Sequence, residues 1–131
     1  MIGIVIVSHS PKVAEGVREL ASQMAQGRVK IVAAGGVDDD TIGTNAERIH
    51  GALIEADSED GVLVLLDLGS AVMSTQMAIE LLPEDQQKKI VISEAPLVEG
   101  AVIAAVEASI GHDMEKVNAA AEAASTMRKL M

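Results

Sequence analysis

The run Ile2-Gly3-Ile4-Val5-Ile6-Val7, followed at once by Ser8-His9-Ser10-Pro11, decides how this chain folds. The apolar part is nearly continuous and does not alternate, which is typical of a strand covered on both faces within a parallel sheet. Apolar residues at helical spacing follow, with Ser10 placed to cap a helix and Pro11 suited to its first turn. The opening of the chain therefore predicts a strand, a short turn that carries His9, and a helix.

Further apolar runs repeat this pattern along the chain, and helical segments separate them. The other expected strands are Ile31–Ala34, Val62–Leu66 and the shorter Ile90–Ile92. The later helices are expected from Thr44, where Thr44 and Glu47 have the spacing of a capping box, over Ala71–Leu82, over Val98–Ser109 and over Met114–Leu130, the last two separated at Gly111. Alternating strands and helices with right-handed crossovers predict an α/β fold. We expect one domain over residues 1–131, an open, mainly parallel sheet of order 2-1-3-4 with helices on both faces.

Composition limits the classes of function. The 131 residues include no Phe, Tyr, Trp or Cys, and the net charge is −10. A strongly acidic chain without aromatic side chains is not expected to bind nucleic acid or an anionic membrane. Without cysteine it has no disulfide and no thiolate metal site. The apolar beginning is far shorter than the roughly 20 residues of a membrane span and has no basic leader, so we expect a cytoplasmic protein.

The turn after the first strand is the first of three places that could carry chemistry. In the sheet order 2-1-3-4, the first and third strands are neighbours whose connections leave in opposite directions. Ligands bind beside such a switch point, at the carboxyl ends of the strands. His9 would lie in this crevice next to the amino end of a helix, whose free backbone N–H groups favour an anion such as phosphate. The alternative is that His9 is an ordinary polar loop residue.

The second place is Asp67-Leu68-Gly69-Ser70-Ala71, at the end of the third strand. The same sheet order puts Asp67 next to His9. A carboxylate on one ring nitrogen would fix the tautomer and leave the other nitrogen free as a nucleophile. Gly69 permits a tight turn, and Ser70 can cap the next helix while it offers its hydroxyl to a phosphate. The alternative is an ordinary strand–turn–helix in which Ser70 is only a cap.

The third place is the segment Gly35–Thr44, which is long and carries Asp38-Asp39-Asp40. Its composition indicates a solvated loop, although its position at the same sheet edge allows it to frame the pocket or to meet a partner. The chain has no glycine-rich nucleotide motif, and the spacing of His9, His50 and His112 suggests no metal site. These features fit a phosphate carrier better than a complete kinase.

Four motifs lie in order along the chain: Ile4–Ser10, Ala34–Thr44, Asp67–Ala71 and Ala95–Gly100. Together they resemble the mannose-family IIA domain of the bacterial phosphoenolpyruvate-dependent phosphotransferase system. More narrowly, they resemble its branch in the dihydroxyacetone kinase complex, the phosphotransfer subunit. The sugar-transporting branch usually has Gly after the active histidine, whereas this chain has Ser10, and Ile42-Gly43-Thr44 also favours the dihydroxyacetone branch.

The resemblance implies a phosphotransferase mechanism. His9 would accept phosphate from the histidine-bearing phosphocarrier protein and pass it to ADP on the nucleotide-binding subunit of dihydroxyacetone kinase. Asp67 would be the second catalytic residue. The residues expected to bind phosphate or a partner are Ser10, Gly36, Thr44, Gly69 and Ser70.

Family membership also implies a homodimer with no permanently bound cofactor, because the phosphate is carried covalently on His9. Some relatives carry additional carboxy-terminal phosphocarrier and enzyme I-like domains, which this sequence does not show, so we expect it to depend on separate proteins for phosphate. Two other functions stay open. One is the IIA component of a mannose-family sugar transporter, and the other is a non-catalytic regulatory domain.

Overall fold

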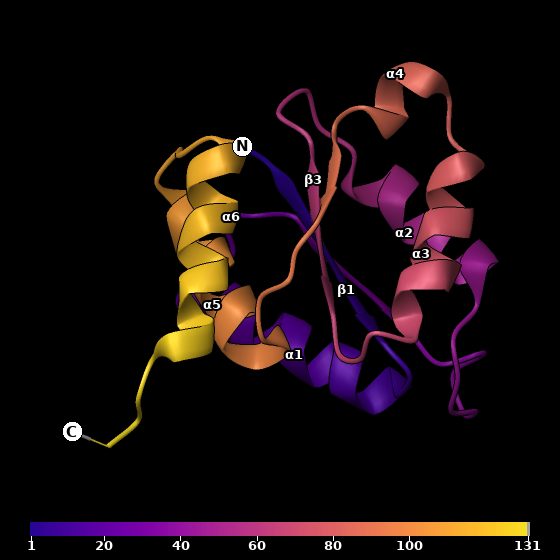
Figure 1. Ribbon diagram of the computed structural model, residues 1–131, viewed down its shortest axis with the longest axis horizontal. Coiled ribbons are helices and arrows are strands. Elements are labelled where there is room, and N and C mark those ends of the chain that lie inside the picture. Colours follow the sequence, from indigo (N-terminus) through magenta and orange to yellow (C-terminus); the bar gives the residue numbers. More distant parts are fainter. Residues whose placement is uncertain (131) are drawn as a thin grey trace.

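The structure, a computed structural model, describes residues 1–130 as a parallel sheet with helices on both faces (Figure 1). The strands are β1 (Gly3–Ser8), β2 (Ile31–Gly35), β3 (Val62–Leu66) and β4 (Ile90–Ile92). The helices are α1 (Pro11–Met24), α2 (Ala46–Ala56), α3 (Ala71–Glu80), α4 (Glu84–Gln87), α5 (Leu97–Ser109) and α6 (Met114–Ala123), with a 3₁₀ turn at Ala124–Thr126. The strand order β2-β1-β3-β4 confirms the predicted α/β fold.

The register of the strands brings their carboxyl ends to one edge of the sheet. Ser8 of β1 lies beside Gly35 of β2, and Val7 lies beside Leu66 of β3. All six residues of β1 are buried, which explains why its apolar run is continuous. His9 and Asp67 directly follow two neighbouring strands, and the sheet therefore places them at the switch point predicted from the sequence.

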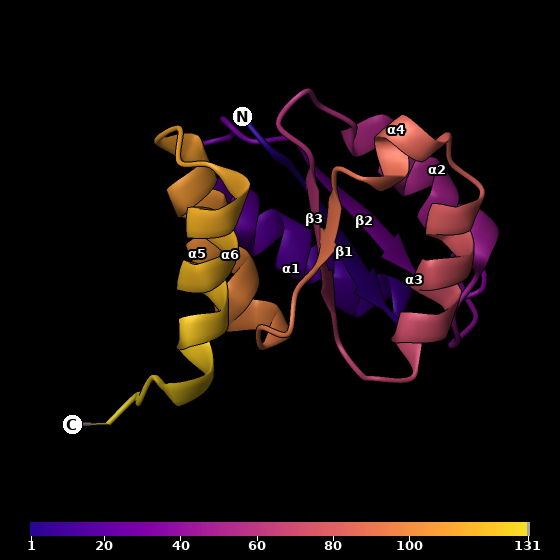
Figure 2. The same ribbon diagram turned by 45° about the horizontal axis from the view of Figure 1, so that its top comes forward.

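The core consists of two apolar layers, one on each face of the sheet. Helices α1, α5 and α6 cover one face, and α2 and α3 cover the other (Figures 1 and 2). Within β1, Ile4 and Ile6 belong to the first layer and Val5 and Val7 to the second, as the alternation of side chains along a strand requires. No aromatic side chain takes part in either layer, since the chain has none, and alanines line much of the buried helix faces.

Helix α2 begins two residues later than the sequence predicted. The side-chain oxygen of Asn45 accepts the backbone N–H groups of Glu47 and Arg48, so Asn45 is the N-cap. The predicted capping box of Thr44 and Glu47 is wrong. The hydroxyl of Thr44 makes a hydrogen bond with Ser74 on α3 instead.

Two later helices are shorter than expected. Helix α3 ends at Glu80, and the separate turn α4 follows Pro83. Helix α6 ends at Ala123, where the hydroxyl of Thr126 donates to the Ala123 carbonyl and thus competes with the helical hydrogen bonds. The predicted break at Gly111 is present, with a φ of 88°. Among residues 1–130, no helix combines the length and the apolar character that crossing a bilayer requires.

Candidate active site

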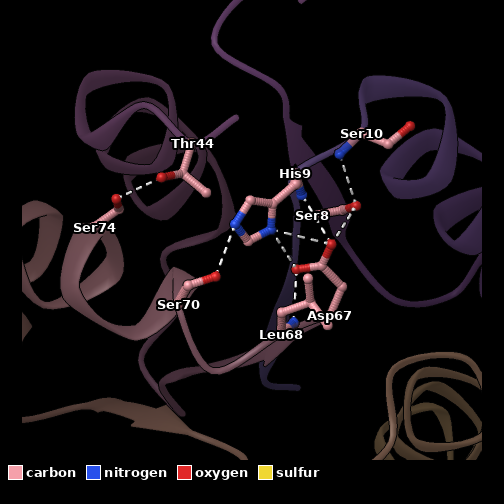
Figure 3. Close-up of polar contacts among 8 residues, drawn as sticks. All are labelled: Ser8, His9, Ser10, Thr44, Asp67, Leu68, Ser70 and Ser74. Atoms are coloured by element: carbon pink, nitrogen blue, oxygen red, sulfur yellow. Dashed lines mark hydrogen bonds and ion pairs between the residues drawn. The ribbon is translucent and has the colours of Figure 1, made fainter. Parts of the chain in front are cut away.

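His9 and Asp67 face each other across the ends of β1 and β3 (Figure 3). Nδ1 of the His9 ring lies 3.0 Å from Oδ1 of Asp67 and 3.3 Å from Oδ2. The same carboxylate accepts the backbone N–H of His9 at 2.9 Å. One carboxylate therefore holds both the backbone and the ring of His9, and Nε2 is the ring nitrogen that it leaves uncovered.

The Asp67 carboxylate also accepts hydrogen bonds from its own surroundings. The hydroxyl of Ser8 donates to it at 3.0 Å, and the backbone N–H of Leu68 donates at 2.8 Å. Burial by itself raises the pKa of Asp67, but the hydrogen bonds from the His9 backbone, the His9 ring and Ser8 outweigh burial and lower that pKa below its ordinary value. Because an ionised carboxylate only accepts, the neutral ring of His9 carries its proton on Nδ1 and its lone pair on Nε2.

Ser70 contacts the other side of the ring. Its Oγ lies 3.0 Å from Nε2 of His9, and it donates its proton because Nε2 carries the lone pair (Figure 3). The hydroxyl therefore does not cap α3: Ser70 occupies the N-cap position without a side-chain capping bond. The prediction that the Ser70 side chain caps the helix is therefore wrong, and the second ring nitrogen, which keeps its lone pair, accepts a hydrogen bond that the sequence did not predict.

Gly69 does not have the role in the turn that the sequence suggested. Its φ is not positive, and a Cβ at this position would meet nothing within 4 Å, so the turn does not require glycine. Within residues 1–130, the backbone N–H groups of Gly69 and Ser70 have no acceptor, whereas those of Ala71 and Val72 bond to the carbonyls of Leu68 and Gly69. Two free N–H groups thus lie at the amino end of α3, next to the ring.

The segment from Gly36 to Thr44 is attached to the end of β1 at two carbonyls. The N–H of Gly36 donates to the Ser8 carbonyl at 3.1 Å, and the N–H of Gly43 donates to the His9 carbonyl at 2.8 Å. Gly36 has a φ of 75°, and a Cβ there would lie 2.6 Å from the Asp38 carbonyl oxygen. The middle of the segment is exposed, as its composition predicted, but its ends hold the backbone of the candidate nucleophile.

Ser10, which was expected to bind phosphate or a partner, makes its hydrogen bonds to Ser8 and Val13 and not to the ring of His9. Its hydroxyl accepts the N–H of Val13 at 3.2 Å, which confirms it as the cap of α1, and Figure 3 shows this hydroxyl directed away from His9. Its backbone N–H donates to the hydroxyl of Ser8. Ser10 therefore positions α1 and does not touch the ring.

Two residues of the site were missed from the sequence, Ser8 and Ser74. Ser8 is 1% exposed and ends an otherwise apolar strand, so a polar residue at that position was the signal available. Ser74 lies four residues after Ser70 and therefore on the same face of α3, but no sequence pattern pairs it with Thr44.

We predict that Asp67 makes stability depend on pH below about pH 4. Because the folded-state pKa of Asp67 is lowered, its ionised form stabilises the fold at pH values above the unfolded-state value of about 3.9. This contribution is lost as the pH falls through the lower, folded-state pKa. In urea titrations, the difference in the free energy of unfolding between the wild type and an Asp67→Asn variant should therefore shrink between pH 5 and about pH 2. A difference that stays constant with pH would contradict the prediction.

Comparison with known proteins places these motifs in a family context. The family model described as PTS system fructose IIA component matches residues 3–118. The chain is 44% identical over 120 residues to the phosphoryl donor subunit DhaM of the PEP-dependent dihydroxyacetone kinase of Escherichia coli (strain K12), covering 89% of this chain and 25% of that protein. It is 38% identical to the phosphoryl donor subunit DhaM of the PEP-dependent dihydroxyacetone kinase 2 of Listeria innocua, covering 89% of this chain and 94% of that protein.

These relatives differ in length. The chain spans about a quarter of the length of the Escherichia coli relative and nearly all of the Listeria relative. The crystal structure of EF1359, a protein of unknown function, matches the fold with a TM-score of 0.83 and 36% identity, covering 94% of this chain and 95% of that one.

Proposed function

The chain belongs to the family of the PTS system fructose IIA component, as its resemblance to the mannose-family IIA domain indicated, and from this premise we propose that it carries a phosphoryl group on His9. It accepts the group from the histidine-bearing phosphocarrier protein and passes it to ADP on the nucleotide-binding subunit of dihydroxyacetone kinase. The observation that carries the proposal is the ring geometry of His9, with Nδ1 held by Asp67 and Nε2 directed to Ser70. The names of the DhaM relatives, phosphoryl donor subunits of that kinase, support the choice of acceptor.

The first transfer uses the lone pair on Nε2. Nε2 attacks the phosphorus of the donor's phosphohistidine, a bond from Nε2 to phosphorus forms, and the bond from phosphorus to the donor nitrogen breaks. Nδ1 keeps its proton, so the phosphorylated ring of His9 carries a positive charge that the ionised Asp67 balances. In the second transfer, an oxygen of the β-phosphate of ADP attacks the phosphorus, and the electrons of the broken bond return to Nε2.

The amino end of α3 stabilises the transferred group. The hydroxyl of Ser70 must leave the Nε2 lone pair before attack, and it can then donate to a phosphoryl oxygen. The free N–H groups of Gly69 and Ser70 donate to the same oxygens, as N–H groups at a helix amino end do for bound phosphate. Phosphoryl transfer depends mainly on such positioning and charge stabilisation. Ser10, Gly36 and Thr44 lie in the segments that border His9, and we assign them to the surface that a partner contacts and to the backbone framework around His9.

Reconstitution tests the proposal directly. The chain is incubated with phosphoenolpyruvate, the upstream carriers and either the ADP-loaded kinase subunit or a sugar-transporter subunit. We expect an acid-labile, base-stable adduct on this chain, which then disappears as ATP forms on the kinase subunit. Transfer to the transporter subunit alone would favour the sugar-uptake alternative, and no labelling would favour the regulatory domain.

Three further properties follow from the family resemblance and are proposed with it. The chain acts as one domain over residues 1–131, as a homodimer, and in the cytoplasm, with no cofactor other than the phosphate on His9. Light scattering on a gel-filtration column measures the molar mass in solution. A mass of one chain would contradict the homodimer.

The two partners should compete for one surface, because each must bring its phosphorus or nucleophile to the same Nε2. Around His9, the residues Ile42 and Leu68 are 69% and 59% exposed, and the acidic segment Asp38–Asp40 lies beside Ile42. We predict that the kinase subunit displaces the phosphocarrier from this chain. We also predict that added salt slows both encounters, since an acidic face attracts a basic one. Stopped-flow binding at several salt concentrations measures both effects, and simultaneous binding without loss of affinity would contradict a shared surface.

A further inference from the structure

A hydrogen bond between two hydroxyl groups connects the segment 36–45 to helix α3, on the two sides of the His9 ring. Oγ1 of Thr44 lies 2.6 Å from Oγ of Ser74 (Figure 3). Thr44 directly follows Gly43, whose N–H holds the carbonyl of His9. Ser74 lies one turn along α3 from Ser70, whose hydroxyl contacts Nε2. The bond therefore connects the segment that holds the backbone of His9 to the helix that contacts its ring.

On the Thr44 side of this bond, several hydrogen bonds hold the segment in place. The N–H of Val37 donates to the Thr41 carbonyl at 2.9 Å and closes the segment on itself. The side-chain amide of Asn45 donates to the Val37 carbonyl at 3.0 Å while its oxygen caps α2. Thr44 thus lies between two residues that fix the segment: Gly43, which is bonded to the His9 carbonyl, and Asn45, which caps α2.

The amino end of α3, in contrast, has few attachments of its own. The helix has no side-chain capping bond, its fully buried residues are the small Ala71, Thr75 and Ala78, and its one large core residue, Ile79, lies near its carboxyl end and is only partly buried. The hydroxyl of Thr75 is buried without a hydrogen-bond partner. Within residues 1–130, the bond from Ser74 to Thr44 is the one hydrogen bond between α3 and the segment 36–45. Without it, side-chain packing and no hydrogen bond would set the distance between α3 and this segment.

We propose that Ser74 is a positioning residue for phosphoryl transfer, acting through Thr44. It sets where the amino end of α3, with the hydroxyl of Ser70 and the two free N–H groups, stands relative to Nε2 of His9. This inference rests on the proposed function, because it assumes that Nε2 receives phosphate. Reacting atoms must approach in line to about 3–3.5 Å, and a displacement of about 1 Å can cost roughly 10²-fold in rate.

The test compares a small-molecule phosphoryl donor, phosphoramidate, with the phosphocarrier protein. Phosphoramidate phosphorylates histidine without any partner: Nε2 attacks phosphorus, the bond to the amine nitrogen breaks, and ammonia leaves after it takes a proton from solvent. We expect a Ser74→Ala variant to lose about 10- to 100-fold in the rate of labelling by phosphoramidate. With the phosphocarrier it should lose the same factor in kcat and keep its KM, since the docking surface is unchanged. The ¹⁵N shift of Nε2 should move toward that of a ring without a hydrogen bond.

Three variants complete the design. Ser74→Thr keeps a hydroxyl and should restore most of the rate. Thr44→Val removes the partner hydroxyl, and the double variant with Ser74→Ala should lose no more than either single variant, because both break one bond. Ser22→Ala removes a hydroxyl from the last turn of α1, at the end of the helix far from the site, and should leave the rate unchanged.

Several outcomes would overturn the inference. The inference is wrong if the Ser74→Ala variant is labelled at the wild-type rate. It is also wrong if the variant loses rate together with global stability and Ser74→Thr does not restore the rate. Failure of the proposed function gives a different result. In that case, the wild type labels with phosphoramidate but not with the phosphocarrier, while the effect of Ser74→Ala on phosphoramidate labelling still decides the positioning role.

Discussion

A His9→Ala protein is expected to acquire no acid-labile, base-stable phosphate when it is incubated with phosphoenolpyruvate and the upstream carriers. The ring of His9 lies at the switch point of the sheet, with one nitrogen held by a carboxylate and the other carrying the lone pair. Removing a nucleophile that works in such a unit costs on the order of 10⁶-fold in enzymes where it has been measured. Within detection limits, transfer should therefore disappear.

The other two histidines supply the matched controls for this prediction. His50 is half-buried within α2, and His112 lies at the junction of α5 and α6 beside Glu107. His50→Ala and His112→Ala variants should be labelled at the wild-type rate. Mass spectrometry under alkaline conditions locates the adduct. Full labelling of the His9→Ala protein would remove His9 from the mechanism.

Loss of the Asp67 carboxylate is expected to slow transfer by about 10²- to 10⁴-fold while the fold stays intact. In an Asp67→Ala variant nothing orients the ring through Nδ1 or balances the charge of the phosphorylated ring. An Asp67→Asn variant should be equally slow, because an amide can donate to Nδ1 and thus shift the ring proton to Nε2. That tautomer has no lone pair where the phosphorus must bind.

Single-turnover labelling by rapid quench measures this loss, and ¹⁵N spectra of the ring report the tautomer. Asp57→Ala is the matched control, because Asp57 pairs with Lys89 at the opposite edge of the sheet and should not affect the rate. If Asp67→Ala transferred phosphate at the wild-type rate, Asp67 would have no part in the chemistry, despite its contacts with His9.

The sequence was sufficient to pair His9 with Asp67 because both follow buried strands. Continuous apolar runs identified β1 and β3, and the common strand order made them neighbours. The position of a residue directly after a strand is then fixed by the sheet and not by its own side chain. The same reasoning located the segment Gly35–Thr44 at the site edge without showing what its residues contact.

The hydrogen-bond partners of hydroxyl groups were predicted less well than the strands, for a physical reason. A serine or threonine near a helix start can cap the helix or bond to a residue distant in sequence, and the two hydrogen bonds are of similar strength. Ser70 and Thr44 both made the distant bond, to His9 and Ser74, while Asn45 capped α2. Only the packing of α3 against the rest of the fold decides between these choices.

The aromatic-free core also determines how this protein can be observed. Near-ultraviolet absorption and intrinsic fluorescence come from Trp and Tyr, and the chain contains neither. Its unfolding is therefore invisible to emission measurements, and its concentration cannot be read at 280 nm. In a mixture with a tryptophan-containing partner, the fluorescence emitted after excitation at 295 nm comes from that partner alone. Docking and release at His9 can thus be followed from the partner's side, with no label on either protein and no background from this one.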